Sequence, residues 1–438
     1  MTTPDGQPGR QRQEMIYRNG VYGSAPAVPT DFEALQRAAK AKMSPRAWAY
    51  VAGGAGAGAG MTNNRAAFDR WAIVPRMLRD CSRRDLGVTL FGRRLPAPLL
   101  VAPVGAAGLV HPRADVEIGA AAAAVGVPYI FSNQGSAAME DTAAEMDRVA
   151  AARASAAPRW FQLYWSTNDA VVDSFVRRAQ AIGADALVVT VDTTVLGWRP
   201  QDLNLGSLPF TQAVGIAQYT SDATFMQSVR DRVAAARAAG ERPEVRVTRA
   251  ALRTLVSLAR NVPGAALRNL VSPVPRASVE TFLDTYSRPT LTWADIASLR
   301  ERTTLPILVK GLLHPDDARQ AVDIGVDGIV VSNHGGRQVD SVIGAADALV
   351  DVSTAVAGRI PVIFDSGIRC GADIVKALAL GADAVTVGRP HIYGLAIAGR
   401  RGVQDVLENL IAELDLMLAL TGVRSIGELD TELLRRIA

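Results

Sequence analysis

Short runs of apolar, mostly β-branched residues recur along the chain, and most are followed by alanine-rich or charged stretches with helical spacing. One phrase returns three times: AIGADALVVTVD begins at Ala181, DIGVDGIVVSNH at Asp323 and ALGADAVTVGRP at Ala379. Each phrase holds the end of a helix, a glycine of the kind that caps helices, and then a short apolar strand of the fully buried type. The pattern predicts strands and helices in regular alternation.

Eight strands of this buried type are predicted. They span residues 99–101, 128–131, 160–163, 186–189, 306–309, 328–331, 361–364 and 384–387. Continuous apolar strands that alternate with helices are typical of a closed parallel barrel whose sheet is covered on both faces. We therefore expect an α/β fold, a (β/α)8 TIM barrel over residues 96–438. An N-terminal extension and helical segment, residues 1–95, is expected to pack on this barrel.

A long segment, residues 203–291, separates the fourth and fifth strands and far exceeds an ordinary connection between a strand and a helix. It is rich in Arg and Ala, with apolar residues at helical spacing, as in RVTRAALRTLVSLARNVPGAALRNLV. Helices that cover the barrel mouth as a lid, or that form an oligomer contact, are the favoured interpretation. A basic helix on a membrane surface is the alternative.

The composition argues against several classes of protein. The chain has 438 residues, 49% of them hydrophobic, and a formal net charge of only +4, so we expect neither a nucleic-acid partner nor membrane association. Cys81 and Cys370 stand far apart and outside any CxxC pattern, so we expect no disulfide framework and no metal site. The first twenty residues lack the apolar core of a signal peptide, which makes a cytoplasmic location the expectation.

The residues that follow the strands carry the candidate chemistry, because the active site of such a barrel forms where its strands end. SNHGGRQVD, from Ser332 to Asp340, follows the sixth strand and offers a histidine and an arginine. FDSGIRCG ends the seventh strand and VGRPHIYG ends the eighth. Each of these two places a glycine and an arginine where barrels commonly bind phosphate, through backbone N–H groups and a guanidinium. Together they favour a cofactor that carries phosphate.

These segments, with WFQLYW, TVDTTVLGWR and ILVKG, resemble the signature segments of the FMN-dependent α-hydroxy-acid oxidising family. The resemblance runs from about Tyr50 to the C-terminus and is interrupted by the long segment 203–291. GVYGSAP, YVAGGAG and GWRPQDLN resemble the lactate 2-monooxygenase branch of that family in particular. The resemblance implies that the cofactor is FMN and that the chain forms a homo-oligomer, either a tetramer or an octamer.

The resemblance also implies which residues contact the cofactor. The positions that match the family's FMN contacts are Pro103, Val104, Gly105, Ser132, Gln162, Thr190, Lys310, Asp365, Gly367, Arg369, Gly388 and Arg389. Lys310 would stabilise the negative charge that develops on the reduced flavin.

Three matching residues are implied to be catalytic: His334, Asp192 and Tyr164. His334 would act as the general base, since imidazole is the side chain best matched to proton transfer near neutral pH. Asp192 would orient the imidazole ring and stabilise its protonated form. The proton on carbon and the proton on the hydroxyl oxygen both remain candidates for the first transfer.

Five residues are expected to bind the substrate: Tyr50, Tyr164, Arg199, Arg337 and Gln134. A 2-hydroxy acid arrives as a carboxylate, which Arg337 and Arg199 can hold with directional, charge-assisted hydrogen bonds. The tyrosine hydroxyls would fix its orientation. Gln134 stands where members of the family often have an apolar or aromatic residue, so its amide either faces the substrate side chain or points to solvent.

The expected reaction is oxidation of a small, lactate-like L-2-hydroxy acid to the 2-oxo acid, with O2 as acceptor and coupled decarboxylation, as in the lactate 2-monooxygenase branch. Gly105, where several oxidases carry alanine, agrees with this expectation. The alternatives are an oxidase that releases hydrogen peroxide and a dehydrogenase linked to a quinone or protein. An alternative of another class is a flavin-binding maturation factor that acts on a peptide-derived substrate.

One glycine-rich stretch, GGAGAGAG at residues 53–60, superficially suggests a dinucleotide-binding loop. No strand precedes it, although such a loop requires one. A flexible loop is therefore expected there.

Overall fold

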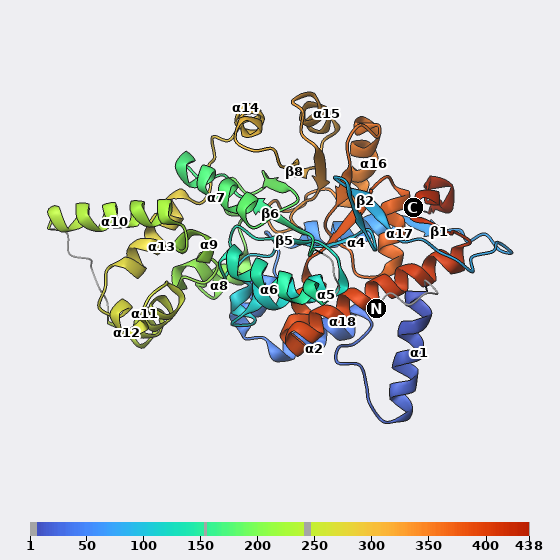
Figure 1. The fold of residues 1–438 in the computed structure, drawn as a ribbon, viewed down its shortest axis with the longest axis horizontal. Coiled ribbons are helices and arrows are strands. Elements are labelled where there is room, and N and C mark those ends of the chain that lie inside the picture. Colours follow the sequence, from blue (N-terminus) through green and yellow to red (C-terminus); the bar gives the residue numbers. More distant parts are fainter. Residues whose placement is uncertain (1–6, 153–155, 241–246, 438) are drawn as a thin grey trace.

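The computed structural model describes residues 7–152, 156–240 and 247–437 and is built around a closed barrel of eight parallel strands (Figure 1). The strands of the barrel are β4 (Leu99–Val101), β5 (Tyr129–Phe131), β6 (Arg159–Leu163), β7 (Leu187–Thr190), β8 (Ile307–Leu312), β9 (Gly328–Val331), β10 (Val362–Phe364) and β11 (Ala384–Val387). They pair in sequence order, and β11 closes the barrel onto β4. The predicted (β/α)8 barrel is confirmed.

The inside of the barrel is filled by side chains from alternate strand positions, which form a hydrophobic cluster separate from the outer core. Its strand members include Leu100, Ile130, Trp160, Val188, Leu308, Val330, Ile363 and Ala384. A hairpin of β2 (Val88–Leu90) and β3 (Arg93–Leu95) adds Leu90 and Leu95 to this cluster. Because the interior is packed, the barrel is no channel, and a ligand has room only at an end.

Helices cover the outside of the strands, which are buried on both faces. They are α5 (Ala114–Val125), α6 (Met139–Ala151), α7 (Asp169–Ala181), α15 (Pro315–Asp323), α16 (Ala345–Val356), α17 (Gly371–Ala379) and the long, kinked α18 (Arg389–Thr421). Several of them begin with an acidic residue or an Asn cap in the first turn, which stabilises a helix N-terminus. Their apolar faces meet the strands in one continuous core.

Four helices precede the barrel: α1 (Pro8–Val21), α2 (Phe32–Lys42), α3 (Pro45–Ala52) and α4 (Ala59–Asp69). Helices α1 and α2 pack against α18, and the buried Arg12 of α1 forms ion pairs with Asp405 and Glu408. Strand β1 (Trp71–Ile73), which follows these helices, pairs with β12 (Leu434–Arg436) near the C-terminal end of the chain (Figure 1).

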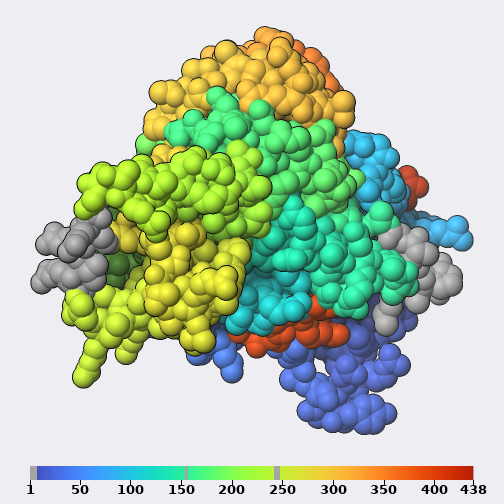
Figure 2. Space-filling model, turned by 60° about the vertical axis from the view of Figure 1, so that its left-hand side comes forward, coloured from blue at the N-terminus to red at the C-terminus, as the bar shows by residue number. Residues whose placement is uncertain are grey.

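Most of the segment between β7 and β8 folds into helices that project to one side of the barrel as a lobe (Figures 1 and 2). The lobe comprises α8 (Pro200–Asn204), η2 (Pro209–Gln212), α9 (Ala217–Thr220), α10 (Ala223–Ala238), α11 (Arg249–Asn261), α12 (Ala266–Asn269) and α13 (Val274–Thr285). The last helices of the segment are α14 (Trp293–Ser298), which lies away from this lobe on the side of α15 and α16, and η3 (Leu299–Glu301). Edge-to-face contacts tie this lobe to the barrel. Tyr219 lies 4.9 Å from Phe282 of α13 and 4.9 Å from Phe175 of α7, measured between ring centroids.

Two further observations concern the described residues only. None of their helices has the length and apolar character that crossing a bilayer requires. Within the same ranges, no group of three or more histidine, cysteine or acidic side chains lies close enough together to hold a metal ion.

The aromatic contacts predict that Phe282 anchors the lobe. Phe282 has no exposed surface, so Phe282→Ala should leave a cavity and lower the free energy of unfolding by about 3–5 kcal/mol. The neighbouring Leu283 is 37% exposed, and Leu283→Ala should cost much less. Urea unfolding of both variants measures the difference, and equal losses would show that Phe282 is no anchor.

Candidate active site

A cavity of about 450 Å³ opens where the barrel strands end. Most residues predicted for the site line it: Tyr50, Pro103, Val104, Gly105, Gln134, Gln162, Tyr164, Arg199, Lys310, His334, Arg337, Asp365, Gly367, Arg369, Gly388 and Arg389. Ser132, Thr190 and Asp192 do not line it but lie directly behind side chains that do. The barrel therefore brings together residues that are scattered over the whole sequence.

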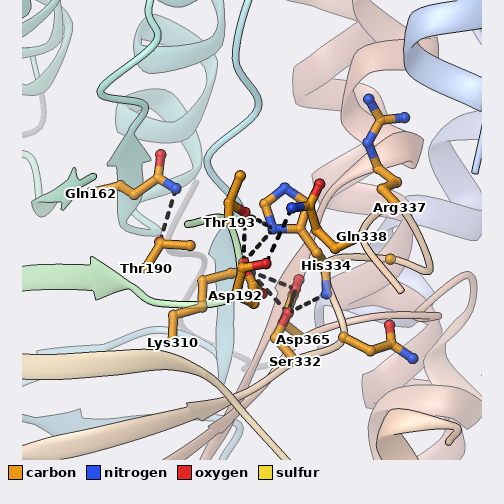
Figure 3. A network of polar contacts seen from close by, with 12 residues as sticks. Gln162, Thr190, Asp192, Thr193, Lys310, Ser332, His334, Arg337, Gln338 and Asp365 are labelled. Carbon is orange, nitrogen blue, oxygen red and sulfur yellow. Dashed lines mark hydrogen bonds and ion pairs between the residues drawn. The ribbon is translucent and has the colours of Figure 1, made fainter. Parts of the chain in front are cut away.

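The side chains of His334 and Asp192 form the central pair of the site (Figure 3). His334 follows β9 and Asp192 follows β7, and the imidazole Nδ1 lies 2.7 Å from the carboxylate Oδ1. Thr193 donates a hydrogen bond of 2.8 Å from its hydroxyl to the same Oδ1. The carboxylate is thus fixed by one neighbour in the chain and one across the barrel.

The protonation of this pair follows from its surroundings. Burial would raise the pKa of Asp192, but the imidazole of His334 and the ammonium of Lys310 outweigh it and hold that pKa at about 2. Burial lowers the pKa of His334 below its ordinary value, although the Asp192 carboxylate acts in the opposite direction. Because an ionised carboxylate only accepts hydrogen bonds, Nδ1 of a neutral His334 carries the proton. The lone pair on Nε2 is left to accept one.

The backbone at His334 is left-handed, with φ of +56°, and Gly335 and Gly336 continue in that region. Such values are uncommon for a residue with a side chain, and they mark a backbone held by its surroundings. A Cβ on Gly336 would lie 2.6 Å from the backbone nitrogen of Met61 in α4. The two glycines after His334 therefore allow this loop to turn tightly against the N-terminal helices.

A second polar network lies beneath this pair, around Lys310 at the end of β8 (Figure 3). The Lys310 ammonium lies 2.9 Å from the Ser332 hydroxyl and 3.2 Å from the Asp365 carboxylate, and Thr386 donates to Asp365 from the next strand. Burial would lower the pKa of Lys310, but the carboxylates of Asp365 and Asp192 raise it. The site thus keeps a buried cation beside the His334 and Asp192 pair.

Gln162, Ser132 and Thr190 form a small chain of neutral polar groups at the same strand ends. The Gln162 amide donates to the Thr190 hydroxyl at 2.9 Å, and its oxygen lies 3.3 Å from the Ser132 hydroxyl. All three are buried, and only Gln162 lines the cavity, so its amide is the member of this chain that a ligand there can contact.

The two arginines that were predicted to bind the substrate carboxylate are both held in place by hydrogen bonds. Arg337 donates from Nη1 to the Gly53 carbonyl at 2.9 Å, and its guanidinium lies 5.1 Å from the ring centroid of Tyr50. Arg199 donates from Nε to the Arg337 carbonyl and from Nη2 to the Gln338 side chain. Burial, with the like charge of Arg199, lowers the pKa of Arg337 to about 9. An anion in the cavity would relieve this repulsion.

The glycine-rich stretch 53–60 begins as a loop after α3, with no strand before it, as predicted, and runs into α4. Ala57 and Ala59 donate from their backbone nitrogens to the Asp340 carboxylate, at 2.7 and 3.0 Å. Gly56 has φ of +49°, and a Cβ there would lie 2.3 Å from the same carboxylate. The glycines are needed for this close approach, which ties the end of α3 to the loop that carries His334.

The part of the cavity wall formed by Gly388, Arg369 and the start of α18 is suited to an anion. Gly388 begins α18 without a side-chain cap, and the first residues of this helix line the cavity. Among the described residues, none accepts a hydrogen bond from the guanidinium of Arg369, which lies over the Phe32 ring at 4.4 Å. Arg389, in contrast, donates to the carbonyls of Val51, Gly53 and Gly335. Uncapped helix termini and free arginine donors are typical of phosphate sites.

Several lining residues were not predicted. Phe210 and Tyr286 reach the cavity from the segment between β7 and β8, and Tyr286 stacks on Phe282 at 4.9 Å. No motif marks them, because their position depends on how that segment folds back. Gln134, which was predicted, is buried and lines the cavity, so it does not point to solvent.

Comparisons with known proteins agree with this geometry. The family described as FMN-dependent dehydrogenase matches residues 39–436. The chain is 40% identical to an L-lactate oxidase of Lysinibacillus sphaericus, over 95% of both chains. It is 39% identical to an FMN-dependent alpha-hydroxy acid dehydrogenase of Penicillium citrinum, over 97% of this chain and 96% of the relative. The crystal structure of mandelate oxidase with (S)-4-hydroxymandelic acid superimposes with a TM-score of 0.74, at 33% identity, over 93% of this chain and 98% of that one.

The central pair predicts how His334 titrates. The Asp192 carboxylate favours the charged imidazolium, so Asp192→Asn should lower the pKa of His334 further below 6.5. Histidine-selective NMR titration measures the value in both proteins. The buried His391, whose pKa of about 4 reflects burial and its own backbone partner, is an internal control that should not move. An unchanged or higher pKa of His334 in the variant would contradict the proposed pairing.

Proposed function

The chain belongs to the FMN-dependent dehydrogenase family, and from that premise we propose that it oxidises a small, lactate-like L-2-hydroxy acid with O2 as acceptor and decarboxylates the product. Membership of the family confirms the resemblance drawn from the sequence. The protein is an FMN-dependent α-hydroxy-acid oxidoreductase. The choice of substrate, the use of O2, the fate of the product and the role of each residue are the proposal.

The cavity has the donors that FMN needs. The ring system would be held where Gln162 and Lys310 line the cavity and provide donors of hydrogen bonds and a positive charge, with Thr190 supporting the Gln162 amide from behind. The phosphate would be held at Arg369 and the uncapped N-terminus of α18. When bound, FMN would supply the two-electron redox chemistry of the reaction. The buried cation of Lys310 favours negative charge beside it.

The substrate carboxylate is assigned to Arg337 and Arg199. Each guanidinium donates some of its N–H groups to protein acceptors and has other N–H groups left for a ligand. Because both are held before the substrate arrives, little side-chain freedom is lost on binding. Tyr50 and Tyr164 line the same part of the cavity and contribute hydroxyl groups that orient the acid.

His334 is proposed as the base. Its Nε2 accepts a proton from the hydroxy acid, while Nδ1 keeps its own proton and donates it in a hydrogen bond to Asp192. The carboxylate stabilises the imidazolium that forms, and the low pKa of Asp192 keeps it ionised throughout. A neutral His334 at physiological pH is the form that this step requires.

One observation supports the proposal of decarboxylation: the segment between β7 and β8 forms part of the cavity wall. It contributes Phe210 and Tyr286 to the lining, and we propose that these side chains slow the departure of the product. Lactate and O2 give pyruvate and hydrogen peroxide, and these two give acetate, carbon dioxide and water. If both are retained together, their encounter is effectively unimolecular and the second reaction precedes release. The L-lactate oxidase among the relatives supports O2 as the acceptor.

The lining of the cavity also bears on the size of the substrate side chain. Gln134 lies against Gly105, where an added Cβ would meet the glutamine side chain at 3.0 Å. Both residues line the cavity, so the glutamine side chain takes up part of its space. We propose that this packing favours a small side chain such as the methyl group of lactate.

Product analysis tests the proposal. With L-lactate in air, acetate and carbon dioxide should exceed pyruvate and free peroxide. Phe210→Ala removes a side chain from the cavity wall and should raise the share of pyruvate and peroxide. Leu205→Ala, a substitution at a 41% exposed position of the same segment, should not change that share. Stoichiometric pyruvate and peroxide from the unchanged protein would make it an oxidase. Slow reoxidation by air would make it a dehydrogenase, and the absence of any reduction by small hydroxy acids would favour a larger substrate.

A further inference from the structure

Gln338 lies one residue after Arg337, and its amide uses every hydrogen-bonding group that it has. The amide nitrogen donates to the carbonyls of Asp192 and Val195, at 3.1 and 3.0 Å. The amide oxygen accepts from Nη2 of Arg199 at 2.6 Å. One side chain from the loop after β9 thus holds the loop after β7 at three points.

The position of Arg199 depends on this amide. Within the described residues, Arg199 donates only to the Gln338 oxygen and, at 3.2 Å, to the Arg337 carbonyl. Arg337 is held quite differently, by the Gly53 carbonyl and the ring of Tyr50. The two arginines therefore have separate supports, and Gln338 supplies the side-chain support of Arg199.

Only a neutral amide fits these three contacts. Two carbonyls require donors and a guanidinium requires an acceptor, which is the set that glutamine offers. A glutamate in the same place could accept from Arg199, but its carboxylate would face two carbonyl oxygens. It would also compete with an incoming carboxylate for the arginine.

We propose that Gln338 is a positioning residue that sets the free edge of the Arg199 guanidinium toward the substrate carboxylate. It acts through Arg199 and has no contact of its own with the reacting atoms. The same amide holds the backbone of Asp192, so the carboxylate-binding arginine and the partner of His334 share one support. This inference rests on the proposed binding of a 2-hydroxy acid.

Binding of oxalate to the FMN-loaded protein tests the proposal without turnover, through the change in flavin absorbance. Gln338→Ala should weaken oxalate binding about tenfold, the scale of one hydrogen bond to a charged group. Val339→Ala, at the next and 62% exposed position, is the matched control and should bind as the unchanged protein does. Equal affinity in Gln338→Ala and the unchanged protein would overturn the inference alone. Failure of the unchanged protein to bind oxalate would overturn the proposed function and this inference with it.

A double-mutant comparison separates positioning from a general structural effect. If Gln338 acts through Arg199, then Gln338→Ala should cause no further loss of oxalate affinity in an Arg199→Ala background. The same tenfold loss in both backgrounds would overturn the inference.

Gln338→Glu provides a readout that does not depend on the alanine variant folding. Below the pKa of the new carboxyl group, the neutral acid can donate to one carbonyl and still accept from Arg199. Above that pKa, its charge repels oxalate. Oxalate affinity of this variant, relative to the unchanged protein, should therefore fall as pH rises through that pKa. A constant ratio across pH 4–8 would contradict the proposal that residue 338 acts on the bound carboxylate through Arg199.

Discussion

The 2.7 Å contact between His334 and Asp192 is the interaction on which the rest of the site depends. These residues are 142 positions apart, and only the pairing of β7, β8 and β9 brings them together. The contact fixes which imidazole nitrogen carries the proton and keeps Asp192 ionised. Lys310 comes from the strand between them, so the same pairing also places the buried cation. The geometry of His334, the proposed base, is thus a property of the barrel rather than of one loop.

The second constraint on the site is the positive charge gathered in its cavity. Arg199, Arg337, Lys310, Arg369 and Arg389 all line one cavity. Burial lowers the pKa of three of these arginines, which shows that the protein itself compensates their charges poorly. Buried charge without a partner is costly, so such a cavity favours anions. In the proposed function, FMN and a 2-hydroxy acid each bring one such anion to this cavity.

The sequence was sufficient for the barrel because buried parallel strands leave a strong signal, and six of the quoted motifs lie at strand ends. The strand limits were close, although β8 continues to Leu312 beyond the predicted 306–309. The contact of the glycine-rich stretch 53–60 with Asp340 was missed because that residue is distant in sequence. Phe210, Tyr286 and Gln338 were missed for a related reason: their roles arise from tertiary packing, and their residue types alone indicate nothing.

The central claim is that His334 takes the proton from the substrate, and anaerobic reduction of the bound flavin by L-lactate in His334→Ala measures this most directly. The account predicts a variant that retains FMN but loses roughly 10²–10⁴ in the rate of flavin reduction, the usual range for removal of a general base. FMN content, measured first, separates a lost base from a lost cofactor. Reduction of the flavin at a nearly unchanged rate in His334→Ala would contradict the account.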